Sequence, residues 1–474
     1  MSITGAIMVP HPPIILPEVG NGEEKKIQAT ITAYEEAARF VASLKPETII
    51  LTSPHSVMYA DYFHVSPGQG ARGDMGAFRA TDVKFDVTYD NAFTDRLARK
   101  ALHDDFPAGV LGEKEPRLDH GTMVPLYFIN KYYTDYKLVR IGLSGLTLPD
   151  HYRFGQLIQH VCDELDRNAV FVGSGDLSHK LLAEGPYGFA KEGPEYDERI
   201  MDVMGSADFG RLLDFDDNFC ERAAECGHRS FCIMAGALDG YDLDVKRLSH
   251  EGTFGVGYGI CTYKVKKAAD DPVKRGASDG RGFLAIWQEE QRKVLDKKRA
   301  AEDPYIRLAR RTIETYVNEG VKIEVPSDIP DEMKSRKAGV FVSIHKEGKL
   351  RGCIGTISSV YANIGEEIIE NAISASTRDP RFNPIKPNEL ESLEISVDVL
   401  SDAEDISGKD ELDVKRYGVI VTKGYKRGLL LPNLDGVDTV DEQVAIALRK
   451  AGLSENEKNY KLKRFEVIRH EVRI

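Results

Sequence analysis

The sequence lacks the features that define several large protein classes. It has only six cysteines in 474 residues and no CxxC pair, so we expect neither a disulfide framework nor a structural zinc knuckle. No apolar run approaches the ~20 residues that span a bilayer. The first residues have neither the basic region nor the long hydrophobic stretch of a secretory signal. These absences predict a cytoplasmic protein without a membrane segment.

Nucleotide and nucleic-acid binding are also disfavoured. The sequence contains no Walker A and no HExxH motif, so P-loop and zincin classes have no support. Acidic residues outnumber basic residues by 76 to 63, which gives a formal net charge of −13 and a pI near 5.5. Because a protein that coats nucleic acid needs a dense basic surface, we expect no nucleic-acid partner.

A polar segment divides the chain into two parts with different patterns. Residues 266–282 are rich in Gly, Asp and Lys and cannot bury much apolar area. A short helix is predicted after it, and this helix contains Trp287, the only tryptophan. We therefore expect a first domain over 1–265, a linker with a helix over 266–302, and a second domain over 303–474.

The first part alternates short apolar runs with helical spacing. The runs ITGAIMV, TIILTS, KLVRIGL and AVFVGSG predict strands, and amphipathic segments such as 23–44 and 154–166 predict helices between them. This order predicts an α/β domain with a largely parallel central sheet flanked by helices. In such sheets ligands bind beyond the carboxyl ends of the strands.

Three of these predicted strands are each followed by an imidazole. His11 lies in PHPP, His55 lies in SPHS, and Asp176 and His179 lie in GDLSH. Two neutral imidazoles and one carboxylate form the facial triad of non-haem Fe(II) oxygenases, so we expect a metal pocket here. His179 is then a candidate acid or base that Asp176 orients. His120, which begins an apolar helix, is expected on the substrate side.

The ordered motifs PHPP, SPHS, DHGTMVPL and GDLSH carry a family resemblance. They resemble the class III extradiol ring-cleaving dioxygenases of the LigB type and their Memo-like relatives, over about residues 1–265. The resemblance implies a metal-dependent oxidoreductase that uses dioxygen and a small aromatic or catecholic substrate. It also implies His11 and His55 as iron ligands and His179 as the catalytic base.

The third metal ligand stays open at this point. In the dioxygenases it is a glutamate late in the domain, and Glu225 in AECGHRSFCIMAGALDG is the matching choice. In Memo-like members a cysteine holds this position, which makes Cys226 a rival, and His228 is a weaker one. Fe(II) is the expected metal, whereas a thiolate ligand would favour Cu(I) or Zn. A non-catalytic Memo-like metal-binding adaptor is the alternative function.

The second part has a different pattern. An amphipathic helix is predicted over 305–320 and another helix over 364–377, with hairpins over 339–355 and 418–432 and a strand over 393–401. This order predicts an α+β domain.

The motif LRGCIG, together with STRDPRF and GLLLPN, resembles the AMMECR domain family over about 303–474. That resemblance implies an α+β fold but no established activity. Arg351, Cys353, Asp379 and Arg381 form a candidate cleft, in which a nearby guanidinium would favour the thiolate of Cys353. The fusion of Memo-like and AMMECR domains resembles a system whose companion is a radical S-adenosylmethionine protein. It therefore implies such a partner, and a modifying enzyme acting on that partner's product is a third hypothesis.

Overall fold

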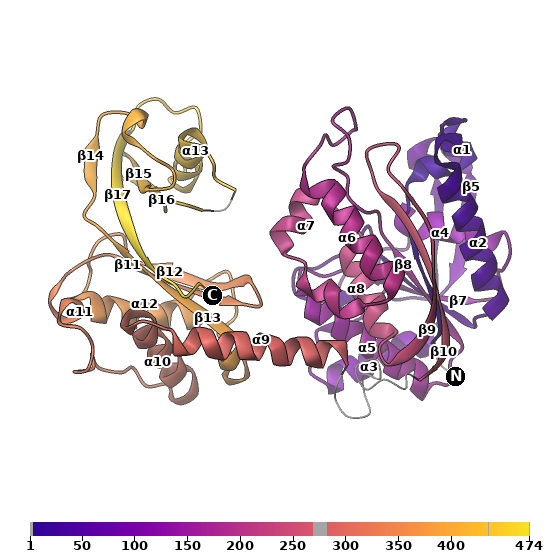
Figure 1. The fold of residues 1–474 in the computed structure, drawn as a ribbon, viewed down its shortest axis with the longest axis horizontal. Coiled ribbons are helices and arrows are strands. Elements are labelled where there is room, and N and C mark those ends of the chain that lie inside the picture. Colours follow the sequence, from indigo (N-terminus) through magenta and orange to yellow (C-terminus); the bar gives the residue numbers. More distant parts are fainter. Residues whose placement is uncertain (1–2, 269–281, 435, 474) are drawn as a thin grey trace. The chain divides into compact units, whose positions relative to one another are not determined.

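The computed structural model describes residues 3–268, 282–434 and 436–473. The chain divides into two compact units, Met1–Glu290 and Gln291–Ile474 (Figure 1). Most of the polar stretch predicted as the start of the linker, residues 269–281, lies outside the described residues. In the described part of the chain, no helix has the length and apolar character needed to cross a membrane.

A six-stranded sheet forms the centre of the first unit. Its strands, in spatial order, are β7 (Lys137–Gly142), β2 (Thr48–Ser53), β8 (Ala169–Ser174), β1 (Ile3–Val9), β10 (Tyr258–Ala268) and β9 (Tyr241–Glu251). The first four pair in parallel, and β10 and β9 extend the sheet as an antiparallel hairpin. The predicted, largely parallel α/β sheet is confirmed. The hairpin at its edge was not predicted.

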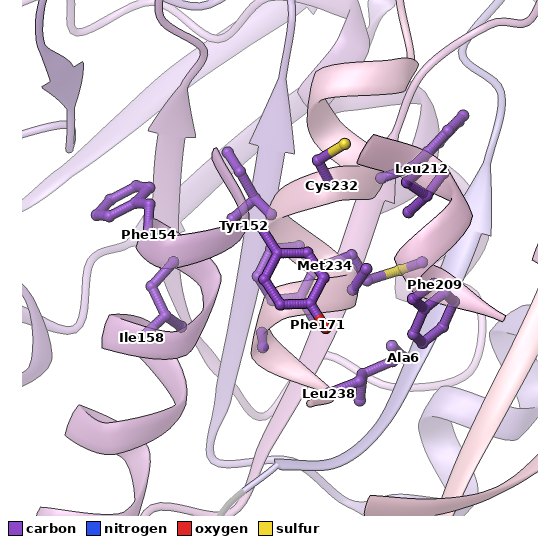
Figure 2. Packing of buried hydrophobic residues seen from close by; sticks show 14 of the residues in the cluster. Ala6, Tyr152, Phe154, Ile158, Phe171, Phe209, Leu212, Cys232, Met234 and Leu238 are labelled. Atoms are coloured by element: carbon purple, nitrogen blue, oxygen red, sulfur yellow. The ribbon is translucent and has the colours of Figure 1, made fainter. Parts of the chain in front are cut away.

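Helices cover both faces of this sheet because its buried strands alternate their apolar side chains. Met8 and Phe171 point into one core with α5 (Leu148–Glu164) and α8 (His228–Ala237), which Figure 2 shows in close view. Ile7 points into the opposite core with α2 (Gln28–Leu44) and α4 (His120–Asn130). The period of two along β1 therefore explains why both faces are covered.

Smaller elements surround these two layers. They are α1 (Pro17–Gly20), β3 (Phe63–His64), β4 (Gly70–Met75), β5 (Ala80–Thr88), α3 (Asn91–His103), β6 (Ala108–Gly109), α6 (Glu192–Ser206) and α7 (Asp217–Ala223). The strands β4 and β5 pair as an antiparallel ribbon.

The helix α9 (Phe283–Ala300) lies in the segment predicted as a linker with a helix. Its first turns belong to the first unit, where Leu284 is buried in the core and Trp287 donates a hydrogen bond to Asp214 at 3.1 Å. Its last turn belongs to the second unit, where Lys298 pairs with Glu394. Both ends of α9 therefore pack against folded structure.

The second unit contains an antiparallel sheet with two larger hydrophobic cores and a small third cluster of Leu400, Ile420 and Phe465 among the described residues. Its strands are β11 (Val340–Lys346), β12 (Lys349–Gly355), β13 (Leu393–Leu400), β14 (Glu404–Ile406), β15 (Tyr417–Lys423), β16 (Lys426–Leu430) and β17 (Lys461–His470), in the order β12-β11-β13-β17-β15-β16 with β14 beside β17. The helices α10 (Pro304–Glu319), α11 (Asp331–Ser335) and α12 (Ile364–Thr377) pack at one end, and α13 (Val440–Lys450) packs at the other. The predicted α+β fold and both hairpins are confirmed.

Candidate metal centre

His11 and His55 meet beyond the carboxyl ends of β1 and β2. These strands flank β8 on either side, so their ends open on the same edge of the sheet. The Nε2 atoms of the two rings lie 3.0 Å apart, and the rings meet edge to face with centroids 4.8 Å apart. His11 is buried, whereas His55 is exposed, so one side of the pair is open to solvent.

The thiol of Cys226 completes this group. Its Sγ lies 3.6 Å from Nε2 of His11, and the ligand atoms of His11, His55 and Cys226 all lie within 4.8 Å of one another. Metal–nitrogen bonds of ~2.0–2.1 Å and metal–sulfur bonds of ~2.3 Å at tetrahedral angles place two nitrogens ~3.3 Å apart and a nitrogen and a sulfur ~3.6 Å apart. The observed spacings therefore fit three ligands of one ion.

Hydrogen bonds fix which nitrogen of His11 faces the group. Its Nδ1 lies 2.9 Å from Oγ of Ser174, and that hydroxyl donates to the carbonyl oxygen of Gly121 at 2.6 Å. Because the hydroxyl proton is used in this way, Oγ accepts from Nδ1–H and the lone pair of Nε2 points at the group. Burial and the neighbouring His55 lower the pKa of His11 to about 3, so the ring stays neutral.

Asp176 and His179 lie beside the same thiol. Together with Cys226 they form a second set of ligand atoms within 4.8 Å of one another. The carboxylate of Asp176 accepts the backbone N–H of His11 at 2.8 Å, and burial raises its pKa to about 6. Nδ1 of His179 is buried without a hydrogen-bond partner among the described residues, and the ring of Tyr187 packs edge-on against it at 5.1 Å.

His120 lies next to the exposed side of the pair. Its ring centroid is 4.0 Å from that of His55 and 5.4 Å from that of Phe78. Asp119 caps the helix that begins at His120 by accepting from the backbone of Thr122, and the same carboxylate binds the hydroxyl of Ser53. Burial, with smaller contributions from His55 and His11, lowers the pKa of His120 to about 3.

Glu225 and His228 are engaged elsewhere. The carboxylate of Glu225 accepts the backbone N–H of His228 at 2.6 Å, where α8 begins, and burial raises its pKa to about 7. The ring of His228 contacts the hydroxyl of Tyr196 at 3.2 Å and the carbonyl of Leu212 at 2.9 Å. Neither belongs to a cluster of possible metal ligands among the described residues, so the geometry favours Cys226 over both rivals.

A cavity of about 1110 Å³ opens beside this group. It borders His55 and His120, and the β4–β5 ribbon and residues 113–118 contribute to its walls. The apolar part of the lining is formed by Val57, Ala77, Phe78, Phe85, Leu118 and Met123. Sequence reasoning missed this cavity, because only its side at His55 and His120 comes from the motifs, whereas the β4–β5 ribbon and residues 113–118 carry none.

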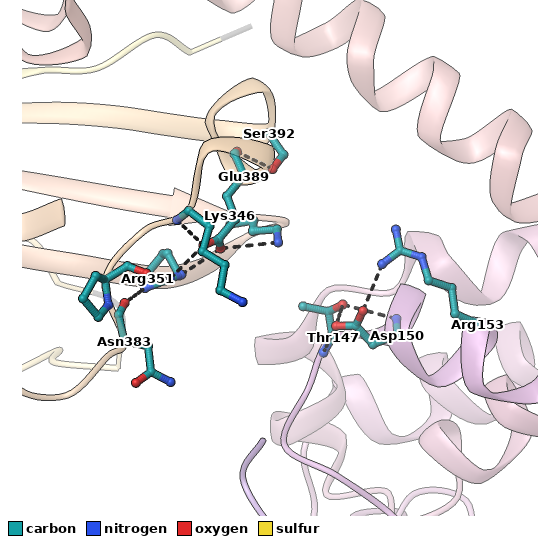
Figure 3. A network of polar contacts seen from close by, with 10 residues as sticks. Thr147, Asp150, Arg153, Lys346, Arg351, Asn383, Glu389 and Ser392 are labelled. Carbon is teal, nitrogen blue, oxygen red and sulfur yellow. Dashed lines mark hydrogen bonds and ion pairs between the residues drawn. The ribbon is translucent and has the colours of Figure 1, made fainter. Parts of the chain in front are cut away.

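The candidate cleft of the second unit comes together only in part. The carboxylate of Asp379 accepts the backbone N–H of Cys353 at 2.9 Å and pairs with Arg381 at 2.7 Å. The Arg381 guanidinium holds the pKa of that carboxyl well below its usual range. Arg351 instead forms two hydrogen bonds with Glu389, at 3.0 and 2.9 Å (Figure 3). The cation that contacts Cys353 is therefore Arg381, through the Cys353 carbonyl at 3.1 Å.

Comparisons with known proteins match both units. The family model of the catalytic LigB subunit of aromatic ring-opening dioxygenase matches residues 5–261, and the AMMECR1 model matches residues 306–470. A protein of Clostridium acetobutylicum is 41% identical over 99% of either chain. A protein of Thermotoga maritima is 49% identical and covers 36% of this chain and 98% of its own. An uncharacterised Pyrococcus horikoshii protein of known crystal structure is 37% identical, covers 35% of this chain and 88% of its own, and has a TM-score of 0.33.

Proposed function

Because the chain belongs to the LigB family of aromatic ring-opening dioxygenase subunits and carries an AMMECR1 domain, we propose that its first domain is a metal-dependent oxidoreductase of the extradiol type. One observation carries the proposal. Nε2 of His11, Nε2 of His55 and Sγ of Cys226 lie within 4.8 Å of one another beside a cavity large enough for a small aromatic molecule.

His11, His55 and Cys226 would hold the metal, and Fe(II) is the ion of the proposal. Bound iron would supply the activation of dioxygen and of a catecholic substrate at coordination positions that the protein leaves open. Burial raises the pKa of the Cys226 thiol well above its usual value, so metal binding must displace a proton from sulfur.

The remaining histidines would act on the substrate. His179, whose Nδ1 has no hydrogen-bond partner among the described residues, would take a proton from a substrate hydroxyl at the metal and return it during ring opening. His120 borders the cavity and stays neutral, so it can donate or accept one hydrogen bond to position the ring.

Anaerobic metal loading and oxygen uptake test this proposal. His11→Ala, His55→Ala and Cys226→Ala should each lose stoichiometric iron, whereas Glu225→Gln should retain it because its carboxylate caps α8. His179→Ala should keep the iron and lose ~10²–10⁴-fold of oxygen uptake with a catechol. Iron loss in His179→Ala would place that residue among the ligands, and full iron in Cys226→Ala would refute the ligand set.

A non-catalytic metal-binding adaptor is the second candidate, and the sulfur ligand favours it. A thiolate suits Cu(I) or Zn better than a carboxylate does. In that case the protein would purify with copper or zinc, and oxygen uptake would be absent with any metal. The AMMECR domain, and a radical S-adenosylmethionine protein as partner, would belong to the same pathway under either function.

A further inference from the structure

Three segments that are far apart in the sequence meet at Cys353 in the second unit. Cys353 lies on β12, and Lys450 is the last residue of α13, whereas Asp379 and Arg381 follow α12. The carboxylate of Asp379 accepts the backbone N–H of Cys353 at 2.9 Å, and Arg381 donates to the Cys353 carbonyl at 3.1 Å. Lys450 is close enough to interact electrostatically with both Cys353 and Arg381. A thiol and two cations therefore lie together at this place in the fold.

The sulfur and the two cations of this cluster are accessible from solution. Cys353 is only half-buried. Its Sγ lies 3.2 Å from the hydroxyl of Ser343, its cross-strand neighbour on β11, and the Arg381 guanidinium also interacts with this sulfur. The side chain of Arg381 is 54% exposed, and Lys450 is exposed as well. A small molecule can therefore reach the thiol together with both cations.

The charges near the thiol leave one cation without a counterion. The carboxylate of Asp379 pairs with Arg381 at 2.7 Å, and that of Glu389 pairs with Arg351 at 2.9 Å. No carboxylate pairs with Lys450 among the described residues, and the other cation that acts on it is Arg381. The positive charge of Lys450 is therefore not neutralised within this cluster.

A bound anion would favour the charged form of Lys450. Burial of part of its side chain lowers the pKa of Lys450 below its usual value, so its surroundings disfavour the positive charge. An opposite charge within ~4–6 Å favours it again. Because the lysine ammonium is a compact point charge, it suits a carboxylate or a phosphate without demanding a fixed geometry. The cluster should thus prefer an anionic ligand to a neutral ligand of the same shape.

We propose that the second unit contains a binding site for a small molecule with a carboxylate or phosphate group, which Lys450 holds beside the thiol of Cys353. Arg381, already paired with Asp379, adds a second positive charge next to the bound group. The site lies within the second unit alone, so it does not depend on the function proposed for the first domain.

Two alkylating reagents of similar size test the charge preference on the wild-type protein. Iodoacetate carries a carboxylate, and iodoacetamide is its neutral counterpart. The ratio of their rates at one thiol therefore measures attraction of the anion and is independent of the nucleophilicity of the sulfur. Peptide mapping of the full chain gives this ratio for Cys353, and 2-mercaptoethanol in the same buffer gives the reference ratio.

We expect the ratio of iodoacetate to iodoacetamide rates at Cys353 to exceed the reference ratio ~5-fold or more, because opposite charges ~4 Å apart attract by that much even in water. It should fall towards the reference at ~1 M salt, where the Debye length is ~3 Å. A ratio at or below the reference would overturn the site. So would a Cys353 that neither reagent modifies in the folded protein.

Variants then assign the preference to one residue. Lys450→Gln should bring the ratio close to the reference, and Lys450→Arg should keep most of it. Arg449→Gln is the matched control, since Arg449 lies in the same last turn of α13 but pairs with Glu455 at 3.1 Å. A ratio that persists in Lys450→Gln would overturn the assignment. An equal loss in Arg449→Gln would overturn it too, because any cation at that helix end would then have the same effect.

Inorganic phosphate and acetate identify the anionic group. At constant ionic strength, a bound anion should slow the reaction of Cys353 with iodoacetate in a saturable manner. Protection by phosphate alone would assign a phosphate ligand, and protection by acetate alone would assign a carboxylate ligand. Protection by both would support the anion site for either group. Protection by neither would show that the surface only attracts anions in general, and would overturn the binding site.

Discussion

At the residue scale, the hydroxyl of Ser174 determines how His11 can act. It accepts from Nδ1 and donates to the carbonyl of Gly121. We therefore expect Ser174→Ala to weaken metal binding ~10–100-fold, as loss of outer hydrogen bonds does at other metal sites. Competition with a chelator of known affinity measures this. Ser230→Ala is a matched control, because Ser230 is also buried but bonds to Thr52; equal affinities in both variants would contradict the role of Ser174.

The thiol of Cys353 is more accessible to a reagent than the thiols of the four buried cysteines. It is half-buried and lies 3.2 Å from the hydroxyl of Ser343, and Arg381 lies beside it. We expect iodoacetamide to modify Cys353 before the four buried cysteines, because the reagent reaches a half-buried thiol first. Peptide mapping of the iron-loaded protein at successive times measures the rate at which each cysteine is modified. Modification of Cys353 only after unfolding would show that the thiol is structural.

At the scale of secondary-structure elements, the sequence predicted the strands that precede the candidate metal ligands. It did not predict how the loops after these strands pack together. Apolar runs located β1 and β2, and the structure brings the histidines after them within 3.0 Å of each other. Which of Glu225 and Cys226 faces the metal centre depends on how the loops pack. Gly227 lies so close to Gly175 that a Cβ atom added to Gly175 would be 2.1 Å from the Cα atom of Gly227. The hydrophobic periodicity of a sequence does not predict such a close contact between two loops.

The sequence pattern also did not predict the β9–β10 hairpin or the cavity. The strand β9 is mostly half-exposed and polar, so it lacks the apolar run that marks the parallel strands. Arg140 lies within KLVRIGL and is buried in the structure, although nothing in that pattern predicts burial of a charged side chain. Its environment comes from Ser66 and from residues 115 and 117, which are distant in sequence.

The helix α9 gives a prediction at the same scale. Leu284 is 5% exposed in the core of the first unit, whereas Val294 on the same helix is 38% exposed. Leu284→Ala should therefore destabilise the first unit by ~2–4 kcal/mol, and Val294→Ala should change its stability little. Chemical denaturation of the full chain measures both. Equal effects would mean that α9 does not contribute to that core.

At the scale of the whole molecule, we propose that the domains of residues 1–265 and 303–474 fold independently of each other, each together with the end of α9 that packs against it. Limited proteolysis should first cut within the polar stretch 266–282, because polar segments rich in glycine are preferred nicking sites. Mass spectrometry of the products locates the cut. First cuts inside either domain would contradict this boundary.

In the proposed metal centre, two imidazoles and one thiolate hold a single metal ion at the strand ends. X-ray absorption spectroscopy of the iron-loaded, anaerobic protein tests this arrangement most directly. We expect one sulfur neighbour at ~2.3 Å together with nitrogen neighbours at ~2.0–2.2 Å, by analogy with the bond lengths of zinc sites, and Cys226→Ser should remove the sulfur. A metal surrounded only by nitrogen and oxygen in the wild-type protein would rule out this ligand set.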